Sequence, residues 1–221
     1  MNSFTATTVS ILAIAVALPS LGADVPSTRT TITRGVSHLN VALRDELIER
    51  GKNDQKYRAA LQERLVKSPT SAPAETLDLI KKQAELDRQN IDRIGEIVRQ
   101  FGWPGRSLVG EDASTAAFMI VQHAELKDQQ KYLPLLEEAA KRGEAKPADV
   151  AMLEDRVLTR EGKKQRYGTQ LHSGPDTGGK LVLYPIDDEE HVDERRAAVG
   201  LPPLAEYLKL FNLAYQAPAK K

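Results

Sequence analysis

Helical periodicity dominates the chain from residue 39 onward. Apolar residues recur at steps of three and four over about 39–66 and again over 74–101, which predicts two long helices. The Ser- and Pro-containing segment 68–73 predicts a turn between them, and Gly102 followed by Pro104 marks the end of the second helix. Because a short turn joins the two helices, we expect them to pack antiparallel.

Shorter elements follow a Gly- and Pro-containing loop at 102–110. The segment 112–125 is apolar on nearly all sides, which predicts a central helix. Gly143 closes the next predicted helix, and Pro147 at a first-turn position opens the one after it. In chain order, the remaining predicted helices cover about 132–142, 147–160, 192–199 and 204–215.

One segment changes period and predicts strands. Residues 165–170 and 180–184 flank the Gly-rich loop 173–179, as expected for a β-hairpin. The predicted fold class is therefore mainly α, an antiparallel helical bundle with one small β-hairpin near the C-terminal third.

The amino-terminal residues predict export. Residues 1–23 carry no charged side chain and contain the apolar run 9–18, which is typical of a signal peptide and too short to span a membrane. A buried first helix is the alternative, because no Lys or Arg precedes the run. We expect a periplasmic or extracellular protein with a flexible arm at 24–38, a single helical domain at 39–215 and a basic tail at 216–221.

Composition and motifs exclude several classes of protein. The chain of 221 residues has no cysteine, so disulfides, thiolate nucleophiles and Cys-bound metals are excluded. Lys and Arg balance Asp and Glu at 31 each, which argues against non-specific nucleic-acid binding. The glycine spacing of 105–112 resembles a phosphate loop, but Glu and Asp stand where Lys and Ser or Thr are required. The acidic run 187–190 is most simply the solvated start of a helix. We predict no cofactor, no metal site and no membrane span in the mature chain; the oligomeric state is left open.

Acidic residues interrupt the apolar faces of the two long helices. One acid lies in an otherwise apolar seam of the second helix: Leu77, Ile80, Ala84, Asp87, Ile91, Ile94, Val98 and Phe101. Asp54 lies in the seam of the first helix, with Arg58 one turn further on. The predicted turn places Asp54 and Asp87 at the same level of the hairpin. Burying an acid costs several kcal/mol unless it is paired or neutral, so these positions predict either a structural Asp–Arg pair or a functional site.

His123 ends the predicted central helix and continues its inward line. An inward histidine is more often a hydrogen-bonded core residue, and acid–base chemistry is the alternative reading. Asp155 and Arg156, late in the fifth predicted helix, read in isolation as a surface pair.

The predicted strand at 165–170 has hydrogen-bonding groups on both faces. A strand that packs on helices normally presents Val, Ile or Leu to the core. Gly168 at its centre also permits close approach of a ligand or another backbone. We favour a pocket wall here over an exposed edge hairpin.

Seven polar motifs follow one another along the chain: Asp54-Gln55-x-x-Arg58, Asp87-x-x-Asn90, Gly102-Trp103-Pro104 with Ser107-Leu-Val-Gly110, Gln122-His123-Ala124-Glu125, Asp155-Arg156, Gln165-x-Tyr167-Gly168-Thr169-Gln170 and Val192-Asp193-x-Arg195-Arg196. Taken in order, they resemble a family of bacterial proteins catalogued only as a domain of unknown function. The resemblance covers about residues 39–210, and the family often has Asp where this chain has Glu125. It implies that the polar residues belong to one motif set, and it implies no activity.

These observations together predict one polar pocket. The candidate catalytic residues are His123, Asp87, Asp54 and Tyr167. The candidate substrate-binding residues are Arg58, Asn90, Trp103, Gln122, Asp155, Arg156, Gln165, Thr169 and Gln170, with the indole expected near the pocket mouth. Because no cofactor motif is present, the leading hypothesis is a hydrolase or lyase acting on an envelope-derived small molecule or glycan. The alternative is a non-catalytic ligand-binding or protein-interaction module whose polar core is structural.

Overall fold

The computed structural model describes residues 39–67 and 74–216. The predicted signal peptide, arm and inter-helix turn lie outside the described residues, as does the basic tail after residue 216. The described part is mainly helical with one small antiparallel sheet, which confirms the predicted fold class.

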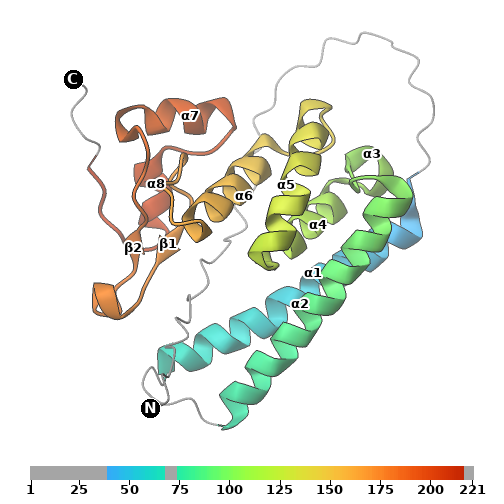
Figure 1. Ribbon diagram of the computed structural model, residues 1–221, viewed down its shortest axis with the longest axis horizontal. Coiled ribbons are helices and arrows are strands. Elements are labelled where there is room, and N and C mark those ends of the chain that lie inside the picture. Colours follow the sequence, from blue (N-terminus) through green and yellow to red (C-terminus); the bar gives the residue numbers. More distant parts are fainter. Residues whose placement is uncertain (1–38, 68–73, 217–221) are drawn as a thin grey trace, which may run out of the picture.

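The first two helices form a long antiparallel hairpin, and the later helices pack on one half of it (Figure 1). The hairpin consists of α1 (Val41–Lys67) and α2 (Ala74–Phe101). Its covered half contacts the short α3 and the central α4, and α5 and α6 pack on each other beyond them. The bounds are α3 (Arg106–Val109), α4 (Glu111–His123), α5 (Leu126–Lys141) and α6 (Pro147–Arg160).

The carboxyl-terminal elements form a smaller unit on the far side of α6 (Figure 1). They comprise β1 (Leu171–His172), the 3₁₀ turn η1 (Pro175–Thr177), β2 (Val182–Leu183), the 3₁₀ turn η2 (Glu189–His191), α7 (Val192–Ala198) and α8 (Leu204–Lys209). This unit has an apolar cluster of its own, made of Leu171, Ile186, Val192, Leu204 and Leu208. The main cluster joins the hairpin to α4, α5 and α6 and includes Leu47, Ile94, Phe118, Leu136 and Leu153. Among the residues described, no helix has the length and apolar character needed to cross a membrane.

The predicted strand at 165–170 is wrong. Only Leu171–His172 pairs with Val182–Leu183, and an isolated bridge joins Gln165 to Ile186. The reason is that backbone amides within 166–169 point at the Asp155 carboxylate instead of at a neighbouring strand. The fourth helix was predicted to begin at about 132, but α5 begins at Leu126. The prediction missed its first turns because they are mostly polar and show little apolar periodicity.

The predicted apolar seam of α2 is wrong in the outer half of the hairpin and at Phe101, which is 42% exposed. Leu77 is 49% exposed and Ile80 is 43% exposed. The buried residues of α2 are Thr76, Gln83, Asn90, Ile94 and Ile97. In this outer half the neighbouring helix is α1, which buries Asp54 and Arg58 there, so polar residues of α2 turn toward it.

Gly168 permits a close approach of side chains in the smaller unit. Its φ is +69°, and a Cβ there would lie 2.9 Å from a methyl carbon of Ile186 and 2.9 Å from one of Leu204. Gly178 has a similar φ of +61°, with nothing within 4 Å of its added Cβ. The predicted close approach at Gly168 is therefore made by core side chains.

We expect Gly168→Ala to destabilise the protein more than Gly178→Ala. Both variants incur the left-handed backbone penalty of about 1–2 kcal/mol. Gly168→Ala adds overpacking, typically about 1–3 kcal/mol. Urea unfolding of both variants measures the difference, and equal losses would show that Ile186 and Leu204 move aside at no cost.

Candidate functional site

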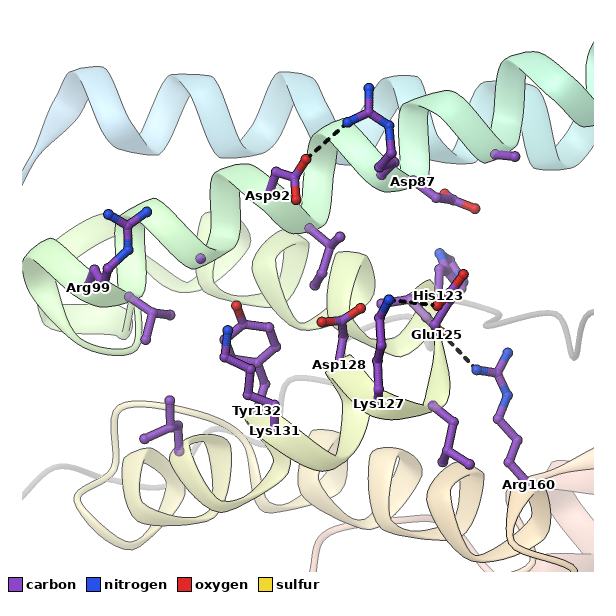
Figure 2. A pocket seen from close by; sticks show the side chains of 18 residues that line it. Asp87, Asp92, Arg99, His123, Glu125, Lys127, Asp128, Lys131, Tyr132 and Arg160 are labelled. Carbon is purple, nitrogen blue, oxygen red and sulfur yellow. Dashed lines mark hydrogen bonds and ion pairs between the residues drawn. The ribbon is translucent and has the colours of Figure 1, made fainter.

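A groove of about 1170 Å³ runs between α2 and α5 and reaches the junction of α4 with α5 (Figure 2). His123 and Arg160 lie toward one end of it, and Arg99 lies toward the other. Its lining combines charged side chains with an apolar floor: Ala84, Asp87, Arg88, Ile91, Asp92, Gly95, Val98, Arg99, His123, Ala124, Glu125, Leu126, Lys127, Asp128, Lys131, Tyr132, Leu135 and Arg160.

Asp54 lies behind the groove, where three helices meet. Its carboxylate is 1% exposed and accepts a hydrogen bond from Nε of Arg58 at 3.0 Å. Nδ1 of His123 lies 2.7 Å from the second carboxylate oxygen. Since α1 carries Asp54 and α4 carries His123, this contact ties the hairpin to the central helix.

Arg58 bridges the two aspartates that the sequence places at one level of the hairpin. Its guanidinium pairs with Asp54 on α1 and also with Asp87 on α2. Gln83, one turn before Asp87, donates to the same Asp87 carboxylate at 2.7 Å. Asp87 is 27% exposed and lines the groove, so this network reaches solvent on one side.

The pKa values of the titratable groups in this network are shifted in different directions. Burial opposes ionisation of Asp54, but hydrogen bonds from His123 and Arg58 outweigh it and lower the pKa of Asp54. Burial raises the pKa of Asp87, although Arg58 acts against this shift. Burial lowers the pKa of His123 to about 4, against the hydrogen bond to Asp54. At neutral pH the imidazole is therefore neutral and Asp54 is ionised.

This protonation state fixes the tautomer of His123. An ionised carboxylate only accepts hydrogen bonds, so Nδ1 carries the proton and donates a hydrogen bond to Asp54. Nε2 is then the unprotonated nitrogen, on a side chain that lines the groove and is 2% exposed. Such a nitrogen can take a proton from a bound molecule or from water.

A second polar cluster holds the chain after α6 and is structural. The carboxylate of Asp155 accepts the backbone amides of Arg166 at 2.7 Å, Tyr167 at 3.0 Å and Thr169 at 3.0 Å. The hydroxyl of Thr169 donates to it at 2.9 Å. Asp155 is thus an anchor for this segment, and it does not line the groove.

Gln165 and Gln170 complete this anchor. The Gln165 side chain donates to the Gln170 and Tyr184 carbonyls, and it accepts the Gln170 amide at 2.8 Å. The Gln170 side chain donates to the Met152 carbonyl at 3.4 Å. The segment 165–170, predicted to be a pocket wall, therefore belongs to this structural cluster, which is separate from the groove. Tyr167 is half-buried in the same segment and does not line the groove.

The remaining predicted residues lie outside the groove. Asn90 accepts a hydrogen bond from Arg50 at 3.2 Å, within the hairpin. Trp103 is buried in the main core, not at the mouth of a pocket as expected. Gln122 donates to the Met152 carbonyl at 3.4 Å, between α4 and α6. Arg156 is buried on α6.

Of the residues that line the groove, the sequence prediction named only Asp87 and His123, and among the polar residues that it missed are Gln83, which contacts Asp87, and Arg160. Gln83 lies four residues before Asp87, and Arg160 lies four residues after Arg156. Spacing of one helical turn from a polar residue already singled out could have indicated both. The sequence also merged two clusters, the groove network and the Asp155 anchor, into one pocket.

The fold and the site together define a mainly helical protein with a polar network behind an open groove. The chain belongs to a family of unknown function, DUF6624, whose model matches residues 41–220. No curated protein and no solved structure matches the chain.

We expect Asp54→Leu to cost more stability than Asp87→Leu. Removing Asp54 leaves buried Arg58 and His123 without their shared acceptor, a change that typically costs about 3–5 kcal/mol. Asp87 is partly exposed, and Arg58 keeps Asp54 when Asp87 is lost, so the second variant loses less. Urea unfolding of the two variants tests this order, and the reverse order would contradict the assigned central role of Asp54.

The neutral state of His123 predicts a pH dependence of stability. Because its folded pKa of about 4 lies below the ordinary value of 6.5, the unfolded chain binds a proton first as pH falls. The stability that the neutral imidazole contributes is complete above pH 6.5 and is lost as pH falls toward 4. At 1.36 kcal/mol per pKa unit, the unfolding free energy lost at pH 5 is about 2 kcal/mol. Unfolding free energies of wild type and His123→Gln at pH 7.5 and 5 measure it; parallel pH profiles would contradict it.

Proposed function

We propose that the groove is the active site of an exported hydrolase or lyase in which His123 is the general base. The observation that supports this most directly is the 2.7 Å contact between Nδ1 of His123 and Asp54, at the edge of an open groove. A carboxylate on Nδ1 orients an imidazole and fixes its proton, which leaves Nε2 as the base.

The neighbouring groups supply the other roles of acid–base catalysis. Asp54 stays ionised and stabilises the imidazolium that forms when His123 takes a proton. Asp87 reaches the groove, and burial raises its pKa, so it is the candidate general acid. The environments of the two groups move the pKa of His123 down and the pKa of Asp87 up, and perturbed titratable groups beside a groove are typical of acid–base sites.

The proposed substrate is an envelope-derived small molecule or glycan. The size of the groove, about 1170 Å³, suits a small organic ligand or a short saccharide. The balanced net charge of the chain gives no reason to invoke a nucleic acid. The periplasmic or extracellular location belongs to this proposal and derives from the predicted signal peptide.

One observation favours the alternative of a non-catalytic ligand-binding module. Asp54 accepts hydrogen bonds from protein side chains at both oxygens, as buried structural acids do. In that case the network fixes the packing of α1 against α4, and the groove binds a ligand without transforming it.

Turnover of a panel of ester, amide, phosphoester and glycoside substrates separates the two functions. We expect at least one substrate class to be turned over and His123→Gln to lower kcat by about 10²–10⁴, the usual contribution of a general base. Asp87→Asn should also lower kcat, whereas Asp45→Asn, an exposed aspartate on α1 outside the groove, should leave it unchanged. Undiminished turnover by His123→Gln would remove His123 from the mechanism, and ligand binding without turnover would support the alternative.

A further inference from the structure

Gly51 lies in the interior of α1, at a position where alanine would form a more stable helix. Glycine is less favourable than alanine in the middle of a helix because it loses more conformational freedom on folding. The structure shows what a methyl group at this position would meet: a Cβ added to Gly51 lies 3.0 Å from Cβ of Ala116 on α4. The missing side chain therefore permits a close approach of α1 to α4.

The close contact at Gly51 cannot be relieved by turning a side chain. Cβ of Ala116 is bonded directly to the backbone of α4, so it moves only with that helix. Because carbon atoms in contact lie about 3.5–4.0 Å apart, a methyl group at position 51 would push the two helices apart by about half an ångström or more. Gly95, the other glycine inside the described helices, differs, because its Cβ would meet the hydroxyl of Tyr132 at 3.2 Å, the far end of a long side chain.

The contact between Gly51 and Ala116 lies beside the contact between Asp54 and His123. Asp54 follows Gly51 by three residues, a rise of about 4.5 Å along α1. His123 follows Ala116 by seven residues, about two turns of α4, and so lies on the same face of that helix. The same two helices carry both contacts, and the spacing at Gly51 sets the distance across which Asp54 reaches the imidazole.

Asp54 is held by the hairpin and moves with α1. Its carboxylate accepts hydrogen bonds from Gln55 at 3.1 Å and Arg58 at 3.0 Å, both on α1, and from Gln83 on α2 at 3.4 Å. His123 reaches it from α4 at 2.7 Å, the short end of the usual range of about 2.7–3.2 Å. Moving α1 away from α4 by about half an ångström takes this distance to the long end of the range, while the bonds inside the hairpin remain.

We infer that Gly51 is a positioning residue of the site: its missing side chain lets α1 approach α4 closely enough for Asp54 to hold His123 with Nδ1 protonated. A side chain at position 51 does not fit against Ala116 at the observed helix spacing. A residue that weakens its own helix is explained by a spacing that the acid–histidine contact requires. This inference deepens the proposed function and rests on it for one readout, turnover, whereas the state of the imidazole is measured without a substrate.

The tautomer of His123 in Gly51→Ala tests the inference. ¹⁵N NMR of the imidazole in the purified protein at pH 7.5 distinguishes a proton on Nδ1 from a proton on Nε2. We expect the wild type to carry the proton on Nδ1, and Gly51→Ala to lose this preference because Asp54 no longer holds the ring. With a substrate, kcat of Gly51→Ala should fall by about 10–10²-fold, since a misplacement by about 1 Å costs about 10²-fold.

The double variant Gly51→Ala/Ala116→Gly restores the spacing. It moves the methyl group from α4 to α1, where the facing atom is Cα of residue 116 at 3.7 Å, an ordinary contact distance. It keeps one glycine and one alanine, so the intrinsic helix propensities balance. We expect it to recover the Nδ1 proton and the wild-type kcat. If Gly51→Ala does not fold, this variant decides alone: a folded protein with the proton on Nδ1 supports the inference, and an unfolded one overturns it.

Two controls separate helix spacing from helix propensity. Gly95→Ala makes the same substitution in α2, and Lys52→Ala removes an exposed side chain of α1 next to Gly51. Both should keep the proton of His123 on Nδ1, and Lys52→Ala should keep the wild-type kcat. A folded Gly51→Ala with the wild-type tautomer would overturn the inference, as would a double variant in which the Nδ1 proton is not recovered.

The two readouts separate this inference from the proposed catalysis. A wild-type protein that turns over none of the substrate classes overturns the proposed catalysis, and the tautomer of Gly51→Ala still tests the role of Gly51. Turnover that depends on His123, together with an unchanged tautomer in Gly51→Ala, overturns the role of Gly51 alone.

Discussion

The hydrogen bond between Asp54 and His123 is the contact on which the arrangement of the site depends. It joins α1 to α4 through two buried side chains, and it lowers the pKa of Asp54, whereas burial keeps His123 neutral. Arg58 extends the same network to α2 by pairing with Asp87. The two helices of the hairpin and the central helix are thus fixed to one another by polar groups at the place where the groove opens.

A polar network at this position has a physical consequence for the hairpin. Apolar packing tolerates small sliding of one helix along another, whereas hydrogen bonds with fixed donors and acceptors define one register. Arg58 reaches both aspartates only when they lie at the same level. The outer half of the hairpin accordingly turns polar residues of α2 inward and leaves Leu77 and Ile80 exposed.

The sequence predicted α2 and α6 well because Gly and Pro mark their ends. It missed α3 within the predicted loop 102–110, and it extended the last helix to 215 although α8 ends at Lys209. The bounds of 74–101 and 147–160 agree with α2 and α6. The sequence prediction failed where a side chain accepts hydrogen bonds from backbone groups far away in the chain. The polar segment 165–170 has the pattern of a strand, but its backbone amides donate to Asp155 on α6. The position of the predicted turn was enough to place Asp54 and Asp87 at the same level along the hairpin. The separation of the groove from the Asp155 anchor depends on the three-dimensional course of the chain, and it leaves no periodic signal in the sequence.

The polar residues in apolar registers are distinguished by the completeness of their hydrogen bonding. Asp155 has its carboxylate saturated by amides and a hydroxyl, so its burial is explained by the segment that it anchors. Arg156, the next residue, is also buried, and its Nε has no acceptor among the described residues. One guanidinium nitrogen of Arg196, which lies outside the groove, is likewise without an acceptor there. Incomplete hydrogen bonding of a buried arginine therefore does not by itself mark a binding site, whereas the saturated carboxylate of Asp155 is explained in full by the segment that it holds.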